Sequence, residues 1–235
     1  MSNKELVKNV IIKTLPVMAG YIVLGIGFGI LLKVNGYGLM WAILMSVLIY
    51  AGSAQYVGIS LISGGATILT SAITILMVNA RHLFYGISML NHYKGAGKRK
   101  PYLIFALTDE TYSLVCNGDY PEGVDKYKYW FLNSLFNQCY WITGSVIGSI
   151  AGSVLKFNTT GIEFSMTALF VTVFVEQWLS TKEHRPAIIG LIASVLCLVV
   201  FGSDKFLIPT MILIVILLTG FRGKLEKKEE ELRNE

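Results

Sequence analysis

The sequence predicts an all-α, polytopic membrane helical bundle, and three observations support this fold class. Hydrophobic residues make up 54% of the 235 residues and charged residues only 15%, against roughly 25% in an ordinary globular protein. The mean hydropathy is +0.59. Ten of the 35 charged residues lie at positions 222–235. The rest of the chain therefore contains nearly uncharged runs of roughly 20 residues, the length that spans the hydrocarbon core of a bilayer.

About eight hydrophobic segments follow one another with short connections, which leaves no room for an extramembrane catalytic domain. We expect residues 1–221 to form a single transmembrane transporter domain. We expect the charged residues 222–235 to form a solvated C-terminal tail. The eight segments are 14–32, 39–62, 66–90, 102–117, 129–155, 163–181, 186–202 and 204–221.

Two of these segments are expected to contain broken helices. Segment 39–62 is interrupted by the small and polar run at 51–55. Segment 102–117 is about sixteen residues long and carries Asp109 and Glu110 at its middle. Such a segment is too short and too charged for a helix that faces lipid, so we expect it to be broken or re-entrant.

Segment 129–155 carries a stripe of glycines at Gly144, Gly148 and Gly152. Small residues at every fourth position lie on one helix face, where they let the backbone of a neighbouring helix approach closely. We therefore expect this face to be a packing surface.

The Lys and Arg residues of the connections indicate the orientation, because cytoplasmic connections carry an excess of them. There are 19 besides Arg81. If the N-terminus is cytoplasmic and all eight segments cross the membrane, twelve of these 19 residues lie on the cytoplasmic side. If segments 39–62 and 102–117 do not cross, sixteen of them lie there. Both arrangements place both termini in the cytoplasm. If the N-terminus is external and only segment 102–117 does not cross, fourteen of these residues lie on the cytoplasmic side, and this alternative stays open.

The sequence does not contain the motifs that are typical of several other classes of protein. There is no HExxH, GxSxG or Walker A motif, so the residues indicate no enzyme. Basic and aromatic residues are not interleaved, and no nucleic-acid partner is expected. Cys116, Cys139 and Cys197 form no CxxC pair and have no histidines at metal spacing, so we expect neither a metal nor another cofactor.

The first polar cluster, Gly52, Ser53 and Gln55, interrupts an otherwise apolar run. A helix broken at membrane depth exposes free N–H groups at one half, and these attract anions. We expect this cluster to bind substrate; the alternative is a helix kink with a packed Gln55.

Two further clusters place ionisable residues inside apolar segments, where each is a candidate functional residue. Asn79 and Arg81 lie in segment 66–90, and Asp109 and Glu110 lie in segment 102–117. We expect Arg81 to pair with one carboxylate, Asp109 rather than Glu110, while the other faces a polar cavity. The alternatives are an interfacial Arg81 at a helix end and a purely structural salt bridge.

With these clusters in order along the chain, the sequence resembles the AzlC family, the large subunit of bacterial branched-chain amino acid exporters. The resemblance covers about residues 10–200. Position 80 departs slightly, because it is Ala where the family often has a larger apolar residue. The matching elements are Pro16 with Gly25 and Gly27-Phe28-Gly29, Ser46 with Ala51-Gly52-Ser53-Ala54-Gln55, Asn79-Ala80-Arg81-His82 with Tyr85-Gly86, and Thr108-Asp109-Glu110.

The resemblance implies export of branched-chain or similar apolar amino acids across the bacterial inner membrane by a multi-pass protein. It also implies a small membrane partner, an AzlD-like subunit. Since no nucleotide-binding motif is present, we expect a gradient, most simply of protons, to supply the energy. Two other functions stay open: a channel or scaffold subunit that does not itself transport, and a membrane enzyme that acts on lipid.

Overall fold

The computed structural model describes the chain continuously over residues 2–154 and in part beyond that range. The later described residues are 164, 167, 168, 171, 174, 175, 178, 179, 181, 183–202, 206, 209, 210, 212–221 and 223. The described residues form helices and turns and no strand, which confirms the all-α class for them. The chain divides into two compact units, Met1–Leu169 and Phe170–Glu235, which are described separately.

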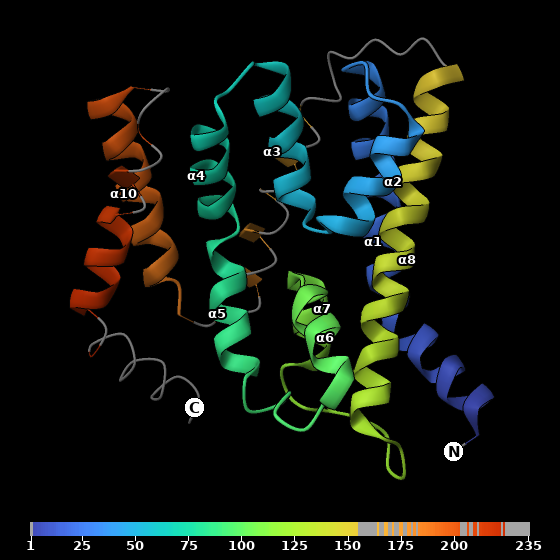
Figure 1. Ribbon diagram of the computed structural model, residues 1–235. Coiled ribbons are helices and arrows are strands. Elements are labelled where there is room, and N and C mark those ends of the chain that lie inside the picture. The colour runs from blue at the N-terminus through green and yellow to red at the C-terminus, as the bar shows by residue number, and fades with distance from the viewer. Residues whose placement is uncertain are drawn as a thin grey trace. The chain divides into compact units, whose positions relative to one another are not determined.

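Two long helices, α1 (Asn3–Val34) and α8 (Lys126–Val154), lie side by side and run in the same direction (Figure 1). At one end, Nζ of Lys128 donates a hydrogen bond to Oδ1 of Asn3 at 2.8 Å. At the other end, the side chain of Lys33 lies against Gly152. The two helices therefore contact each other along almost their whole lengths.

Glycines on both helices form the centre of this contact. A Cβ atom at Gly144 would lie 2.7 Å from the carbonyl oxygen of Ile22, and one at Gly29 would lie 2.5 Å from the backbone nitrogen of Ser149. A Cβ atom at Gly148 would collide with the carbonyl oxygen of Ile26. The prediction that this glycine stripe is a packing surface is confirmed, and its partner is α1.

Helices α2 (Leu39–Leu48) and α3 (Gly52–Ser63) form a half-length hairpin. Helix α2 starts just after the end of α1 and reaches the middle of α8, where Nε2 of Gln138 donates to the carbonyl of Val47 at 3.2 Å. The chain reverses at Tyr50, a non-glycine residue with a φ of 44°. Helix α3 then returns to the starting end, where the hydroxyl of Ser63 donates to Asn35 at 2.9 Å.

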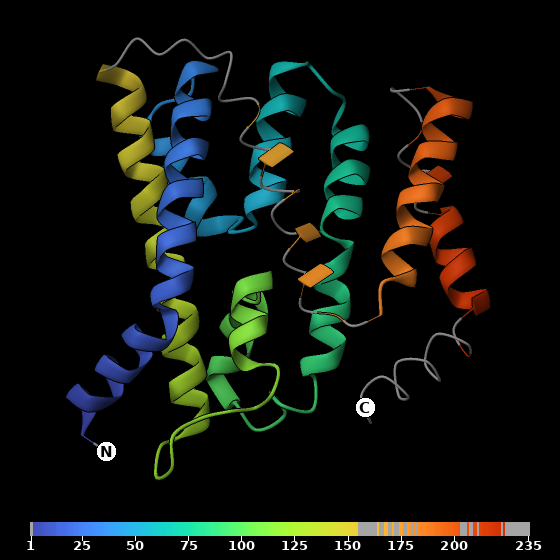
Figure 2. The ribbon, with the colours of Figure 1, turned by 180° about the vertical axis from the view of Figure 1, so that it is seen from behind.

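Helices α4 (Ile68–Val78) and α5 (Ala80–Met89) form a broken pair that is bent by 48°. Asn79 ends the first helix and begins the second, with a ψ of 6° that belongs to neither a strand nor a regular helix. The pair runs from the end at which α3 finishes to the opposite end (Figure 2). This break was not predicted.

Helices α6 (Lys100–Phe105) and α7 (Asp109–Val115) form a second half-length hairpin, which follows the short 3-10 helix η1 (Gly97–Arg99). It starts and finishes near the N-terminal end of α8. There Arg99 pairs with Asp125 at 2.6 Å, and Nε1 of Trp130 donates to the carbonyl of Asp119 at 3.4 Å. The prediction that segment 102–117 is broken is confirmed.

The two hairpins enter from opposite ends of the α1–α8 pair, and their tips meet (Figure 1). The rings of Tyr50 and Phe105, one from each tip, have centroids 6.3 Å apart. Around the second hairpin, a core of buried side chains from α1, α6, α7 and α8 fixes its position, including those of Val10, Leu103, Val115 and Trp130.

The second unit contains α10 (Arg185–Phe201) and the helix Ile212–Phe221. The imidazole of His184, at the start of α10, stacks on the indole of Trp178 with ring centroids 4.1 Å apart. Both helices leave large apolar side chains exposed, such as those of Val199 and Ile216.

The predicted count of about eight hydrophobic segments is not confirmed. Within the described ranges, α1 is long and apolar enough to cross a membrane alone, and the bent pair α4–α5 is a second candidate if it counts as one span. Helices α2, α10 and Ile212–Phe221 are apolar but shorter. Most of the expected segment 163–181 and of the expected tail 222–235 lies outside the described residues.

Candidate functional site

Three helices begin close together in the middle of the first unit. They are α3, which begins at Gly52, α5, which begins at Ala80, and α7, which begins at Asp109. The backbone N–H groups in the first turn of a helix have no partner within the helix and carry the positive end of its dipole. Helices α3 and α5 have no side chain that caps these groups, whereas α7 is capped by Thr108.

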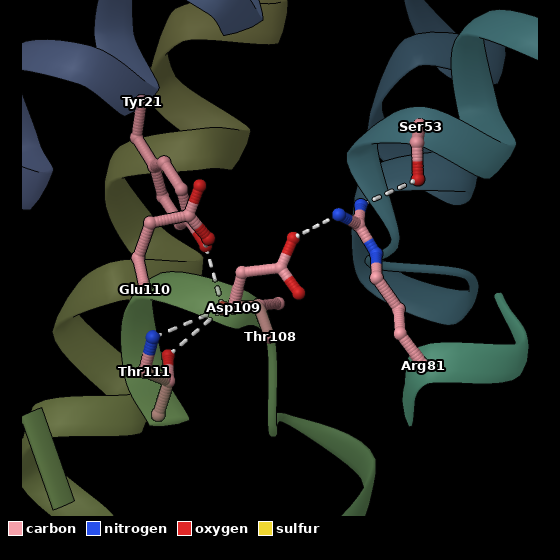
Figure 3. A network of polar contacts seen from close by, with 7 residues as sticks. All are labelled: Tyr21, Ser53, Arg81, Thr108, Asp109, Glu110 and Thr111. Carbon is pink, nitrogen blue, oxygen red and sulfur yellow. Dashed lines mark hydrogen bonds and ion pairs between the residues drawn. The ribbon is translucent and has the colours of Figure 1, made fainter. Parts of the chain in front are cut away.

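Arg81 and Asp109 form an ion pair between two of these helix starts. Nη1 of Arg81 lies 2.7 Å from Oδ2 of Asp109, and the two side chains are 28% and 19% exposed. Nη2 of Arg81 donates a hydrogen bond to Oγ of Ser53, in the first turn of α3, at 3.2 Å. Figure 3 shows these three side chains meeting. The predicted contact of Arg81 with Asp109, rather than with Glu110, is confirmed.

This group keeps free hydrogen-bonding capacity. Nε of Arg81, Oδ1 of Asp109 and Oδ1 of Asn79 are buried and have no hydrogen-bond partner within the described part of the chain. Buried polar atoms are nearly always satisfied in native proteins, so unpaired ones mark a place where a further group binds. One donor and two acceptors are available here.

Glu110 faces a different neighbour from Asp109. The hydroxyl of Tyr21, on α1, donates to Oε2 of Glu110 at 2.6 Å and lies 2.6 Å from Oγ1 of Thr108. Figure 3 shows Tyr21 and Arg81 on opposite sides of the start of α7. Glu110 is therefore directed at a phenol, where we expected it to face a polar cavity.

Hydroxyl and amide groups continue this contact into α8. Oγ1 of Thr108 and Oγ1 of Thr111 are 3.1 Å apart, and the side-chain amide of Asn137 donates to Thr111 at 3.0 Å. Thr111 and Asn137 are fully buried. The start of α7 is thereby fixed to both long helices.

Gln55 and Gly52 contact α8. Nε1 of Trp141 donates to Oε1 of Gln55 at 2.9 Å, and Nε2 of Gln55 lies 3.5 Å from Oγ of Ser46. A Cβ atom at Gly52 would lie 3.0 Å from the indole ring of Trp141. The structure thus brings Ser53, Arg81 and Asp109 together, whereas it directs the buried Gln55 into a neighbouring network.

Tyr21 and Trp141 were not among the residues predicted from the sequence. Each stands four residues before a glycine or serine of the α1–α8 contact, because Gly25 and Gly29 follow Tyr21 at four-residue steps and Ser145 follows Trp141. Residues at this spacing share a helix face. An aromatic residue in line with a glycine stripe is the signal that points to them.

Within the described ranges, no group of three or more His, Cys, Asp or Glu side chains is placed to hold a metal ion. The polar groups of this site suit a small ligand that carries both charges. A carboxylate fits the guanidinium and the uncapped N–H groups, and an ammonium group fits the free carboxylate oxygen.

Comparison with known proteins adds the family. The sequence pattern of the AzlC protein family matches residues 16–155. The chain is 45% identical to the branched-chain amino acid transport protein AzlC of Bacillus subtilis (strain 168), over 92% of this chain and 85% of that protein. No solved structure matches this chain.

Other relatives are named as membrane proteins. An uncharacterized membrane protein of Helicobacter pylori (strain ATCC 700392 / 26695) is 43% identical over 91% of this chain and 93% of its own length. The inner membrane protein YgaZ of Escherichia coli (strain K12) is 26% identical over 85% of this chain and 82% of its own length. Since the family pattern covers more than half of the sequence and the identity to named relatives extends over most of it, the chain is a membrane protein that belongs to the AzlC family.

Proposed function

We propose that this protein is the large subunit of a secondary transporter that exports branched-chain amino acids across the bacterial inner membrane. The observation that carries the proposal is the Arg81–Asp109 ion pair, which lies between helix starts and keeps unpaired buried atoms. An amino acid at neutral pH is a zwitterion and needs donors for its carboxylate and acceptors for its ammonium group.

The arrangement suggests how each end of the substrate binds. The carboxylate binds the guanidinium of Arg81 and the free N–H groups at Gly52 and Ser53, where the dipole of α3 adds positive potential. The ammonium group binds Oδ1 of Asp109 and Oδ1 of Asn79. In the absence of substrate, Arg81 and Asp109 satisfy each other, so neither charge is left alone at membrane depth.

The apolar part of the substrate needs an apolar wall beside these charges. The indole of Trp141 lies against Gly52, and the ring of Phe28 stacks on it with centroids 6.1 Å apart. The relative from Bacillus subtilis is named as a branched-chain amino acid transport protein. Leucine, isoleucine and valine are therefore the proposed substrates.

The two hairpins suggest the orientation in the membrane. Each hairpin starts and finishes at the same end of the α1–α8 pair. We therefore propose that neither segment 39–62 nor segment 102–117 crosses the membrane and that both are re-entrant. This is the arrangement that places sixteen of the 19 Lys and Arg residues inside, with both termini in the cytoplasm. The uncapped start of α3 then lies at mid-membrane, where transporters bind substrate at broken helices.

The proposed energy source follows from the sequence, and the proposed partner follows from the family resemblance. Because the sequence has no nucleotide-binding motif, we propose that a proton gradient drives export and that an AzlD-like subunit completes the transporter. We also propose that residues 1–221 form a single transmembrane transporter domain.

Leucine transport in inside-out membrane vesicles tests the proposal. Vesicles that contain the chain with its small partner are expected to take up radiolabelled leucine when the lumen is acidified, and vesicles without the partner are not. The Asp109→Asn variant, inserted at the wild-type level, is expected to lose this uptake. Uptake that persists in Asp109→Asn favours a scaffold role, and lipid turnover by the purified protein without any gradient favours an enzyme.

A further inference from the structure

The two adjacent acidic residues of α7 are in different chemical surroundings. Successive residues of a helix project about 100° apart, and here Asp109 meets Arg81 at 2.7 Å while Glu110 meets Tyr21 at 2.6 Å. Asp109 therefore has a counter-charge. Glu110 has none, because no cationic nitrogen among the described residues lies within 4.0 Å of its carboxylate.

The other ionisable groups around Glu110 do not supply a counter-charge either. Tyr21 comes from α1, Tyr50 from the tip of the first hairpin and Tyr85 from α5, and all three are phenols. Asp109 is a like charge, and Arg81 is engaged by Asp109 and Ser53. From α8 the network receives the uncharged amide of Asn137. A carboxylate without a counter-charge is costly at membrane depth and binds a proton readily.

The hydroxyl of Tyr21 can respond to this proton. It has one hydrogen and two oxygen neighbours, Oε2 of Glu110 and Oγ1 of Thr108, both at 2.6 Å. When Glu110 is ionised, the phenol donates to it. When Glu110 is protonated, its carboxyl O–H donates to the phenol oxygen, and the phenol hydrogen turns to Thr108, which in turn donates to Thr111. In both states the hydroxyl hydrogens of Tyr21 and Thr108 each have an acceptor.

We propose that Glu110 carries the coupling proton of transport, with Tyr21 as its reversible hydrogen-bond partner, while Asp109 and Arg81 bind the amino acid. The inference rests on the proposed function and divides the site into a proton half and a substrate half. A proton from the aqueous phase adds to Oε2 of Glu110, a partly buried residue, and leaves from the same atom on the other side of the transport cycle. No bond of Tyr21 is made or broken.

Two leucine assays in the same inside-out vesicles separate these halves. In the first, the lumen is one pH unit more acidic than the medium, and leucine accumulation is measured. One unit of pH corresponds to about 1.4 kcal/mol, so exchange of one proton for one leucine sustains an accumulation of about tenfold. In the second, both sides have equal pH, and exchange of labelled for unlabelled leucine is measured, which needs no proton step.

The expected results differ between the two acidic residues. Glu110→Gln is expected to lose the pH-driven accumulation, with a final ratio of about one, and to keep leucine exchange. Asp109→Asn is expected to lose both. The matched control is Glu122→Gln in the exposed turn before α8, which is expected to behave as wild type in both assays.

Every other outcome contradicts the proposal or the function beneath it. If Glu110→Gln still accumulates leucine in response to pH, Glu110 is not the proton carrier. If it loses exchange as well, Glu110 belongs to the substrate half. If Glu110→Gln does not fold, Tyr21→Phe is tested instead, because this variant keeps the carboxylate of Glu110. Tyr21→Phe is expected to shift the pH dependence of leucine accumulation and to leave the exchange rate unchanged. An unshifted pH dependence overturns the proposed role of Glu110 and Tyr21. Failure of the wild-type protein to exchange leucine refutes the proposed function instead.

Discussion

Arg81 and Asp109 each stand in the first turn of a helix, and their side chains meet at 2.7 Å across the space between α5 and α7. A cation at a helix start is opposed by the dipole of its own helix, whereas an anion there is favoured. The position of Arg81 is therefore unfavourable by itself and is made stable by the carboxylate that it faces. In the function that we propose, this pair binds the zwitterionic substrate by exchanging its internal contacts for contacts with substrate.

The first prediction concerns the coupling of these two residues. Arg81→Ala and Asp109→Ala are each expected to abolish leucine exchange and to destabilise the protein, because each leaves the other charge unpaired. The double variant is expected to be more stable than the sum of the single losses indicates, by about 1–3 kcal/mol. Thermal unfolding of the four proteins in detergent measures this difference.

A matched control for this cycle is the ion pair of Arg99 and Asp125, which has nearly the same length but is 41% and 48% exposed. Alanine at either of these positions is expected to cost less than about 1 kcal/mol and to leave exchange intact. Additive losses for Arg81 and Asp109, or full exchange in either single variant, would contradict the coupling.

The second prediction concerns the start of α3. Gly52→Leu is expected to abolish leucine exchange while the protein still inserts, since its Cβ atom alone would lie 3.0 Å from Trp141 and the larger side chain fills the space before the free N–H groups. Gly58→Leu, on the same helix, is the control, because a Cβ atom there meets only the flexible end of Met45 at 3.8 Å. Equal exchange rates in the two variants would remove the start of α3 from the site.

The third prediction concerns the contact of α1 with α8. Gly148→Ala is expected to lower the free energy of unfolding by about 3 kcal/mol, because its Cβ atom meets backbone that cannot move aside. Gly20→Ala, on α1, has nothing within 4 Å of the new atom and is expected to be neutral or slightly stabilising. Thermal unfolding in detergent compares them, and a stable Gly148→Ala protein would show that the helices can separate at this point.

The fourth prediction distinguishes hairpins from crossing segments. In a protein without its native cysteines, Ser63→Cys is expected to react with an impermeant maleimide in intact cells, and Lys98→Cys and Glu122→Cys only in inside-out vesicles. If all eight segments crossed instead, Ser63 and Lys98 would exchange sides and Glu122 would stay inside. The first two positions decide, and the third is the internal control.

The fifth prediction concerns acid. The hydrogen bond donated by Arg99 lowers the pKa of Asp125, which lies in the turn before α8. A lowered folded-state pKa adds stability above the unfolded value of about 3.9, and this contribution disappears as the pH falls through the folded value. Asp125→Asn is therefore expected to unfold slightly earlier than wild type near about pH 6, by no more than about 1 kcal/mol, and equally near about pH 2. A difference that grows in acid would contradict the assignment.

The sequence alone predicted the polar residues of the candidate site, because ionisable side chains are conspicuous in apolar segments. Arg81 and Asp109 were paired for the same reason, since neither charge is stable alone at that depth. The glycine stripe of α8 predicted a close helix contact but not the partner helix. Small residues allow any neighbouring backbone to approach closely, so the stripe does not indicate which helix packs there.

Other features depend on tertiary structure and left no local signal. Segment 66–90 contains neither proline nor glycine near Asn79, so nothing in it predicts the bend at which Arg81 is placed. Segment 39–62 is long enough to cross a membrane, and a hairpin and a crossing helix fit it equally well until the contact of Ser63 with Asn35 is known. The alignment of Tyr21 with the glycines of α1 points to this residue but not to its partner Glu110, which only the structure shows.

The contact of Gly29 with α8 also sets the order of events during biosynthesis. The two partners are separated by more than one hundred residues of chain, which a ribosome synthesises in on the order of ten seconds. During this time we expect the glycine face of α1 to be covered by lipid, while both hairpins emerge without the helix pair that will hold their tips. We therefore expect the fold to be completed by association of helices already in the bilayer, since a chain released before residue 126 lacks α8, which contacts α1 and both hairpins.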